Sequence, residues 1–172
     1  LVGYLRRRAR SVATSEYFED VLPGKERGGV RCEDVQRLSY ADASFDVITH
    51  TEVLEHVPDD RRAFAELYRV LRPGACMLFT VPLHDGAQTI ERACLRDGMI
   101  DHLQAPVYHI DPLRGGVGIL AFRDYGRDIL DRLRDAGFVD ARLIDARTGL
   151  RWLPPRKVIC ARKPHGIGKE PR

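Results

Sequence analysis

The sequence predicts an α/β protein built on a doubly wound, mostly parallel sheet, with an antiparallel hairpin at the C-terminal end. Two observations carry this prediction. Strand-like and helix-like segments alternate through the middle of the chain, as they do in folds whose parallel strands are joined by helices. In addition, residues 75–83 (ACMLFTVPL) form a continuous apolar run, which is expected of a strand covered on both faces.

Length and composition fit one domain. The chain has 172 residues, of which 44% are hydrophobic, and this is enough for a single well-formed core. The net charge of +3, from 28 basic and 25 acidic residues, is too small to indicate a nucleic-acid partner. We interpret the two basic clusters, RRRAR at residues 6–10 and the C-terminal tail, as a solvated helix face and a frayed terminus.

The cysteines and histidines are scattered. The four cysteines form no CxxC pair and have no histidine at zinc-finger spacing, so reduced thiols in a cytoplasmic protein are the simplest interpretation. His84 and His102 are too dispersed to predict a metal site. The sequence has no run of about 18 apolar residues and no signal-peptide pattern, so it predicts neither membrane insertion nor secretion.

The N-terminal third predicts one helix and two short strands. Residues 1–9 (LVGYLRRRA) have the apolar spacing of the end of an amphipathic helix. A short strand follows in residues 11–18 and ends near Glu16. After a loop at residues 22–29, a second strand leads into a turn around Asp34.

The centre predicts a strand and a helix. A turn at residues 41–44 precedes the strand 45–50 (FDVITH). The helix 60–71 carries its apolar residues at helical spacing, with Asp59 or Asp60 as a natural N-cap, and RPG closes it.

The C-terminal half predicts a long insertion, a helix and a final hairpin. Residues 84–113 lack periodicity and are long for a structureless connection, so we expect a functional lid over the substrate. An amphipathic helix is expected over residues 122–138, with its stop at Gly137, followed by antiparallel strands at 139–146 and 155–163. We expect one domain over residues 1–163 and a flexible tail at 164–172.

Four consecutive polar residues, Thr49 to Glu52, follow the buried strand that begins at Phe45. In open α/β sheets, ligands bind beyond the carboxyl ends of the strands. The polar run therefore predicts a ligand site at this edge.

An ordered series of motifs identifies a family. The segment LSYADASFD (residues 38–46), the LEHV at residues 54–57 and the RVLRPGA at residues 69–75 follow one another around a strand and a helix. This series resembles the class I S-adenosylmethionine-dependent methyltransferases, with a type 11-like methyltransferase domain, although Ala75 replaces the second glycine of the last motif. The resemblance covers about fifty consecutive residues, and DAGF (residues 135–138) with the closing hairpin extends it towards the C-terminus. It implies a Rossmann-like fold, S-adenosylmethionine as cofactor and a small-molecule acceptor.

The resemblance assigns cofactor-binding residues. Glu16, at a strand end, would accept both ribose hydroxyls, a role that suits the two oxygens of a carboxylate. Asp34 would accept from the adenine amine, with the backbone N–H of Val35 meeting a ring nitrogen. His50 and Thr51 would line the methionine end. The alternatives are a surface acid for Glu16, a turn-forming aspartate for Asp34, and helix caps for His50 and Thr51.

One element of the resembled family is missing from the sequence. The family has a glycine-rich loop after its first strand, and the GGVG at residues 115–118 is no substitute, because it neither follows a strand nor leads into a helix. We therefore expect the chain to begin one strand late, with that strand's place between the strands that end at Glu16 and His50. An N-terminally incomplete record, direct pairing of the neighbouring strands and a strand supplied by another chain are the three explanations, and we favour the first.

Two histidines are candidate bases for a methyl acceptor. His109 in the insertion is the first and His50 the second, because imidazole exchanges protons near neutral pH. Tyr108 and Asp111 would orient the His109 ring, and the alternative is a histidine that structures a long loop.

Methyl transfer is the favoured activity. A catalytically inactive methyltransferase-like module that acts with a partner chain is the alternative, and a nicotinamide oxidoreductase is disfavoured by LEHV and RVLRPG. The acceptor and the oligomeric state, a homo-oligomer included, are left open.

Overall fold

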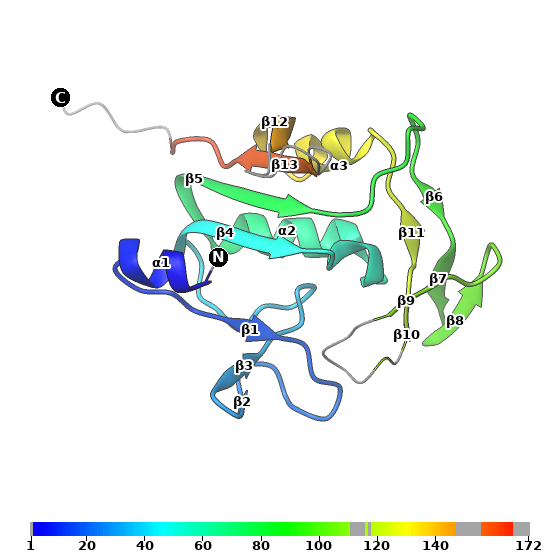
Figure 1. The fold of residues 1–172 in the computed structure, drawn as a ribbon, viewed down its shortest axis with the longest axis horizontal. Helices are drawn as coiled ribbons and strands as arrows, with labels where there is room; N and C mark the ends of the chain where they lie inside the picture. Colours follow the sequence, from blue (N-terminus) through cyan, green and yellow to red (C-terminus); the bar gives the residue numbers. More distant parts are fainter. Residues whose placement is uncertain (1, 111–115, 117, 147–155, 167–172) are drawn as a thin grey trace.

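A computed structural model describes residues 2–110, 116, 118–146 and 156–166 of the chain (Figure 1). The predictions that fall on residues 111–115, 117, 147–155 and 167–172, the role of Asp111 among them, lie outside the described residues.

The main sheet is mixed. Its strand order is β12 (Val139–Ala146), β13 (Arg156–Arg162), β5 (Leu71–Thr80) and β4 (Phe45–Thr51). β4 and β5 are parallel, whereas β5 with β13 and β13 with β12 are antiparallel. The C-terminal antiparallel pair was predicted. The expectation of a mostly parallel sheet is corrected, since one of these three described pairings is parallel.

A second, smaller sheet carries the N-terminal strands. β1 (Ser15–Glu16) pairs in parallel with β3 (Val30–Cys32), which pairs antiparallel with β2 (Glu26–Arg27). This sheet is separate from the main one, so β4 is an end strand in the described part of the chain. The strand that we expected between Glu16 and His50 has no counterpart among the described residues.

Two helices pack on one face of the main sheet. α2 (Asp60–Val70) begins where the Asp59 carboxylate accepts from the N–H of Arg62, as the N-cap prediction requires. α3 (Ile129–Asp135) ends at Gly137, whose φ of +99° suits glycine. The core lies between these helices and the sheet; it is built from buried side chains of α2, α3, β5 and β13, namely Phe64, Leu67, Met77, Phe79, Ile129, Leu133 and Ile159. α1 (Val2–Arg8) buries none of its residues.

The helix expected over residues 122–138 begins late. Residues Arg123–Asp124 instead form β11, which pairs with β6 (Ile90–Glu91). Two contacts oppose a helix here. The Arg123 guanidinium is drawn to backbone carbonyls after β4, and Gly126 lies so close to the backbone of Gln88 that a Cβ atom would clash with it.

The described part of the insertion, residues 84–110, contains short antiparallel ladders. β7 (Ala93–Arg96) and β8 (Met99–His102) form a hairpin, and β9 (Tyr108–Ile110) pairs with β10 (Gly118–Leu120). Asp97 and Gly98, both with positive φ, make the two-residue turn of the hairpin, a pairing that favours the type I′ geometry. Figure 1 shows these ladders beyond the arrowheads of β4 and β5, at the carboxyl edge of the sheet.

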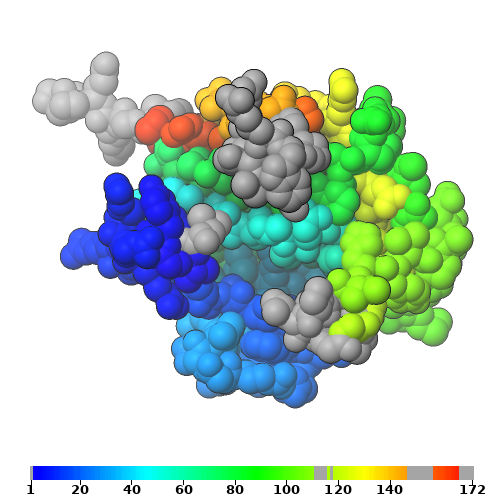
Figure 2. Space-filling view, in the orientation of Figure 1, coloured from blue at the N-terminus to red at the C-terminus, as the bar shows by residue number. Residues whose placement is uncertain are grey.

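In the space-filling view, the blue N-terminal segment and the yellow-green insertion flank the teal region of β4 and α2 (Figure 2). The first residue of the expected tail is held on the domain: the N–H of Gly74 donates to the carbonyl of Pro164, as well as to that of Lys163. None of the helices in the described part of the chain has the length and apolar character that crossing a bilayer requires.

A candidate active site at the carboxyl edge

The end of β4 has unusual backbone geometry. Glu52 follows the strand with a φ of +51°, which is uncommon outside glycine and frequently marks functional sites. Two hydrogen bonds hold it there. Its N–H donates to the carbonyl of Thr80 at 2.9 Å, and the Thr80 hydroxyl donates to its carboxylate at 2.8 Å.

The turn after β4 is clamped by the segment that contains β10 and β11. The turn includes the short 3₁₀ helix η1 (Leu54–His56). The N–H of Phe122 donates to the Glu55 carbonyl at 2.7 Å, and His56 Nδ1 lies 2.9 Å from the Leu120 carbonyl. Because a carbonyl only accepts, Nδ1 carries the proton, and this fixes the tautomer of a neutral His56.

Arg123 adds the charged part of this clamp. Its side chain is 3% exposed, and it donates to the carbonyls of Leu54, Val57 and Pro58. It also pairs with Glu91 at 3.0 Å. Because the Arg123 guanidinium is buried, its hydrogen bonds to these three carbonyls fix the turn.

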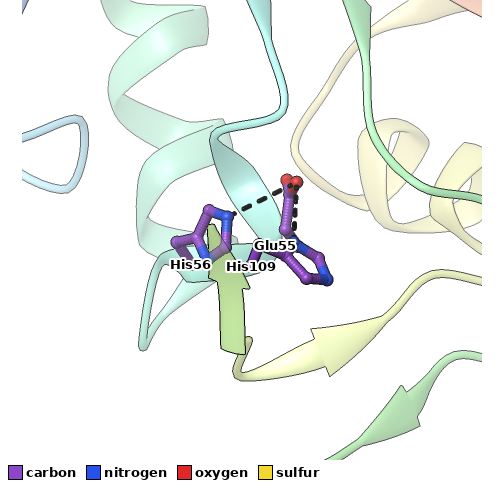
Figure 3. Close-up of side chains that lie close together, drawn as sticks. All are labelled: Glu55, His56 and His109. Carbon is purple, nitrogen blue, oxygen red and sulfur yellow. Dashed lines mark ion pairs between the residues drawn. The ribbon is translucent and has the colours of Figure 1, made fainter. Parts of the chain in front are cut away.

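Glu55 is the most perturbed acid of the site. Its side chain is 1% exposed, and neither carboxylate oxygen has a hydrogen-bond partner among the described residues. Its Oε1 lies 3.7 Å from His56 Nε2 and 3.9 Å from His109 Nδ1 (Figure 3). Burial, together with the smaller effect of the negative charge of Glu52, raises the pKa of Glu55 to about 7.

His109 reaches this point from β9, where it is opposite Ile119 of β10. Its ring meets the His56 ring edge to face, with centroids 5.0 Å apart. The side chain is 36% exposed and therefore open to a second molecule. The structure thus brings His109 to the carboxyl edge of β4, beside a buried carboxylate.

His50 does not face this site. Strand alternation puts it on the same face as Ile48, which packs against the core, and its ring stacks on Phe79 at 4.7 Å. Both ring nitrogens are buried without a hydrogen-bond partner in the described part of the structure. Burial lowers the pKa of His50 to about 4. This geometry does not favour His50 as a cofactor contact or as a base, because both ring nitrogens are buried against the core; the two roles stay predictions.

Thr51 keeps an exposed position at the end of β4, opposite Thr80. The cap alternative for Thr51 is not observed, since the N-cap residue of η1 is Val53, which makes no side-chain hydrogen bond.

Glu16 ends β1, and Asp34 lies two residues beyond the end of the parallel strand β3, whose last residue Cys32 is opposite Glu16. The N–H of Glu33 donates to the Glu16 carbonyl at 3.0 Å. Asp34 also has the turn-forming role that we considered as the alternative, since it accepts from the N–H of Gln36 at 2.9 Å. Its second oxygen keeps acceptor capacity, because the nearest donor, Gln36 Nε2, lies 3.5 Å away.

A hollow of about 300 Å³ adjoins Asp34. Tyr17 and Phe18 contribute aromatic rings to its wall, and residues 19–23 close it. Val35 packs against the core beside the turn. The hollow therefore combines aromatic surface with a carboxylate acceptor, which are the two features that a purine ring with an exocyclic amine needs.

A larger groove of about 850 Å³ runs from Asp34 past the start of α2 to β7. The residues that line this groove do not include Glu55, His56 or His109. The volume of the groove therefore does not point to the cluster that these three residues form. The groove wall carries both signs of charge, from Asp34, Arg37, Asp59, Asp60, Arg61, Arg62, Glu91, Arg123 and Arg132.

Sequence reasoning missed Glu55 and Arg123. Glu55 sits within the LEHV motif, but its exposure and its distance from His109 depend on the insertion folding back. Arg123 was assigned to a helix. The Asp97-Gly98 pair could have predicted the β7–β8 hairpin, because such a pair is typical of two-residue hairpin turns.

Comparison with known proteins finds a family model that matches part of the chain. The model of the methyltransferase domain matches residues 3–79, a range that includes Glu16, Asp34 and the turn after β4. This part of the chain is similar to S-adenosylmethionine-dependent methyltransferases.

Curated relatives match parts of this domain. A ubiquinone biosynthesis O-methyltransferase of Hahella chejuensis is 47% identical over 63 residues, which are 34% of this chain and 26% of that protein. A dimethylglycine N-methyltransferase of Parasynechococcus marenigrum is 31% identical over 71 residues, or 41% of this chain and 24% of that one. The chain spans about a quarter of the length of these relatives.

Solved structures share the fold. The S-adenosylmethionine-dependent methyltransferase of Mesorhizobium loti aligns with a TM-score of 0.50 and 17% identity, covering 81% of this chain and 72% of that one. The [4+2]-cyclase SpnF aligns with a TM-score of 0.51 and 20% identity, covering 80% and 56%. At these identities the likeness concerns the Rossmann-like fold alone.

The buried His50 predicts a pH dependence of stability. Its pKa is lower in the folded than in the unfolded chain, so its contribution is present above about pH 6.5 and is lost as the pH falls towards 4. Between pH 7 and pH 5, wild type should lose about 2 kcal/mol more than His50→Leu in the free energy of unfolding. Urea titrations at the two pH values measure this difference, and equal losses in both proteins would show that the histidine is solvated.

Proposed function

We propose that the protein transfers a methyl group from S-adenosylmethionine to a small-molecule acceptor. The observation that carries the proposal is the position of two acids within the family-matched range: Glu16 ends β1, and Asp34 follows the adjacent parallel strand β3 and lines an aromatic-walled hollow. Open α/β sheets bind ligands at this edge.

The residues present fit the adenosine part of the cofactor. Glu16 is proposed to accept the two ribose hydroxyls, and Asp34 to accept from the exocyclic amine with its less occupied oxygen. The Val35 N–H is proposed to donate to the adenine ring, which Tyr17 and Phe18 would flank. Thr51, exposed at the end of β4, is proposed to border the methionine part.

When bound, the cofactor supplies an electrophilic methyl group on a sulfonium that is a good leaving group. The chain's own residues then have to orient the acceptor, exclude water and take a proton where the acceptor needs it. We propose that His109 accepts this proton. The insertion 84–113 would close over the acceptor, since its ladders lie beyond the carboxyl edge and bring His109 to the end of β4 (Figure 3).

The methyl acceptor is proposed only as a broad chemical class. One curated relative is named as an O-methyltransferase and another as an N-methyltransferase. An oxygen or nitrogen nucleophile on a small molecule is therefore proposed.

A second candidate is a methyltransferase-like binding module that acts with a partner chain. The observation that favours it is β4, whose outer edge is not paired within the described residues. Such an edge presents free backbone donors and acceptors, which a strand from elsewhere can pair with. In that case cofactor affinity should rise when the partner is present.

Substitution of the two acids tests the cofactor assignment. Glu16→Ala and Asp34→Ala should each weaken S-adenosylhomocysteine binding by about 1.5–3 kcal/mol, or about 10–150-fold, because each removes a hydrogen bond to a charged acceptor. Calorimetric titration gives the dissociation constants. Glu26→Ala, an exposed acid on β2, serves as the control and should bind like wild type. Unchanged affinity in both test variants would reject the assignment.

Substitution of His109 tests the proposed base. His109→Gln should lower turnover by about 10²–10⁴-fold, the usual contribution of general base catalysis, while cofactor affinity stays nearly constant. Release of S-adenosylhomocysteine with a panel of phenol and amine acceptors measures the turnover. The exposed His102 of β8 provides the matched control, His102→Gln. Equal rates in wild type and His109→Gln would remove His109 from the mechanism.

A further inference from the structure

Three potential metal ligands converge beneath the insertion. One ligand atom each from Glu55, His56 and His109 lies within 4.8 Å of the others, and Figure 3 shows both imidazoles on the side of the Glu55 carboxylate. The three residues come from two parts of the chain that are more than fifty positions apart. The fold therefore brings them together, and no short sequence motif contains all three.

The Glu55 carboxylate gives an independent indication that something is bound there. It is buried to 1% exposure, yet neither oxygen has a hydrogen-bond partner among the described residues. Buried polar groups are nearly always satisfied, and an exception calls for an explanation such as an ion.

The distances fit a shared cation better than a hydrogen bond. The 3.7 Å to His56 Nε2 and the 3.9 Å to His109 Nδ1 exceed the usual hydrogen-bond range of about 2.7–3.2 Å. Two ligands on one tetrahedral Zn²⁺, each about 2.0–2.1 Å from the metal, lie about 3.3 Å apart. Small side-chain rotations close this gap, and the part-exposed His109 ring has the freedom to make them.

His56 is arranged as metal-binding histidines are. Its Nδ1–H donates to the Leu120 carbonyl at 2.9 Å, so the Nε2 lone pair of the neutral ring points to the Glu55 side. Metal-ligating histidines almost always give their other ring N–H to a carbonyl or a carboxylate in this way, which fixes the tautomer.

We propose that Glu55, His56 and His109 bind one divalent transition-metal cation of the Zn²⁺ type. Two imidazoles and one carboxylate suit Zn²⁺, Co²⁺ or Fe²⁺, whereas Mg²⁺ and Ca²⁺ prefer oxygen ligands. The exposure of His109 leaves the remaining coordination positions open to water or to an acceptor oxygen, as in catalytic metal sites. Glu52, whose charge acts on Glu55, adds negative potential, while the positive charge of Arg123 is balanced by Glu91.

The proposal changes the role of His109. As a ligand, Nδ1 does not take a proton from the acceptor; the cation would instead align a bound hydroxyl and lower its pKa, so that the proton leaves to water. Both roles predict lower turnover for His109→Gln, so activity does not distinguish them. Direct cation binding does.

The test titrates Co²⁺, and separately Zn²⁺, into chelator-treated protein without cofactor. We expect one equivalent of Co²⁺ to bind with visible d–d absorption. His109→Ala and Glu55→Gln should each weaken binding by at least about tenfold, since even outer partners of metal ligands contribute about 10–100-fold. His102→Ala, on β8 of the same insertion, should bind like wild type. Circular dichroism confirms folding of each variant, and the part-exposed His109 keeps the test decisive if Glu55→Gln does not fold.

Absence of d–d bands, substoichiometric binding, or equal affinity in wild type and His109→Ala would overturn the proposal. Mg²⁺ binding with Zn²⁺ excluded would overturn it as well. Because the titration contains no cofactor, its outcome is independent of methyl transfer. S-adenosylhomocysteine binding, measured on the same samples, shows separately whether the cofactor assignment holds.

Discussion

The buried guanidinium of Arg123 is the constraint on which the site depends. It holds the carbonyls of Leu54, Val57 and Pro58 and so fixes the turn that follows β4. The same segment holds Glu55 through Phe122 and His56 through Leu120. Once the turn is fixed, the Glu55 side chain has no route to solvent, and its raised pKa follows from that burial. The segment of β10 and β11, which pairs with β9 and β6 of the insertion, is therefore part of the site's framework.

The site divides into two halves along the carboxyl edge. Glu16 and Asp34, on the small sheet, offer carboxylates beside an aromatic-walled hollow and suit adenosine. Glu55 and His109, beyond the main sheet, combine a buried acid with an open imidazole and suit chemistry on an acceptor. Thr51 at the end of β4 lies on the main-sheet side. The family match covers the first half and the turn of the second, whereas His109 comes from outside the matched range.

The features that depend only on residues close in the sequence were predicted from the sequence. The Asp59 cap, the Gly137 stop and the apolar run of β5 each depend on neighbours in the sequence, and each is present. For His50, a polar residue was assumed to face outward, whereas the strand alternation turns its ring onto Phe79 on the core face. Arg123 shows that contacts with residues distant in the sequence also limit such predictions. The amphipathic pattern of residues 122–138 is real, but the carbonyls that draw Arg123 out of a helix belong to residues 54–58, which no window around residue 123 contains.

The most direct test of this account is the map of backbone amide shifts when S-adenosylhomocysteine is titrated into the protein. The account predicts saturable shifts at residues 16–18, 34–36 and 51–52, with β8 and α3 unaffected. A saturable map centred elsewhere, for example on the groove beside β7, or no saturable shift at any ligand concentration, would contradict the claim that the carboxyl edge of β1, β3 and β4 is the cofactor site.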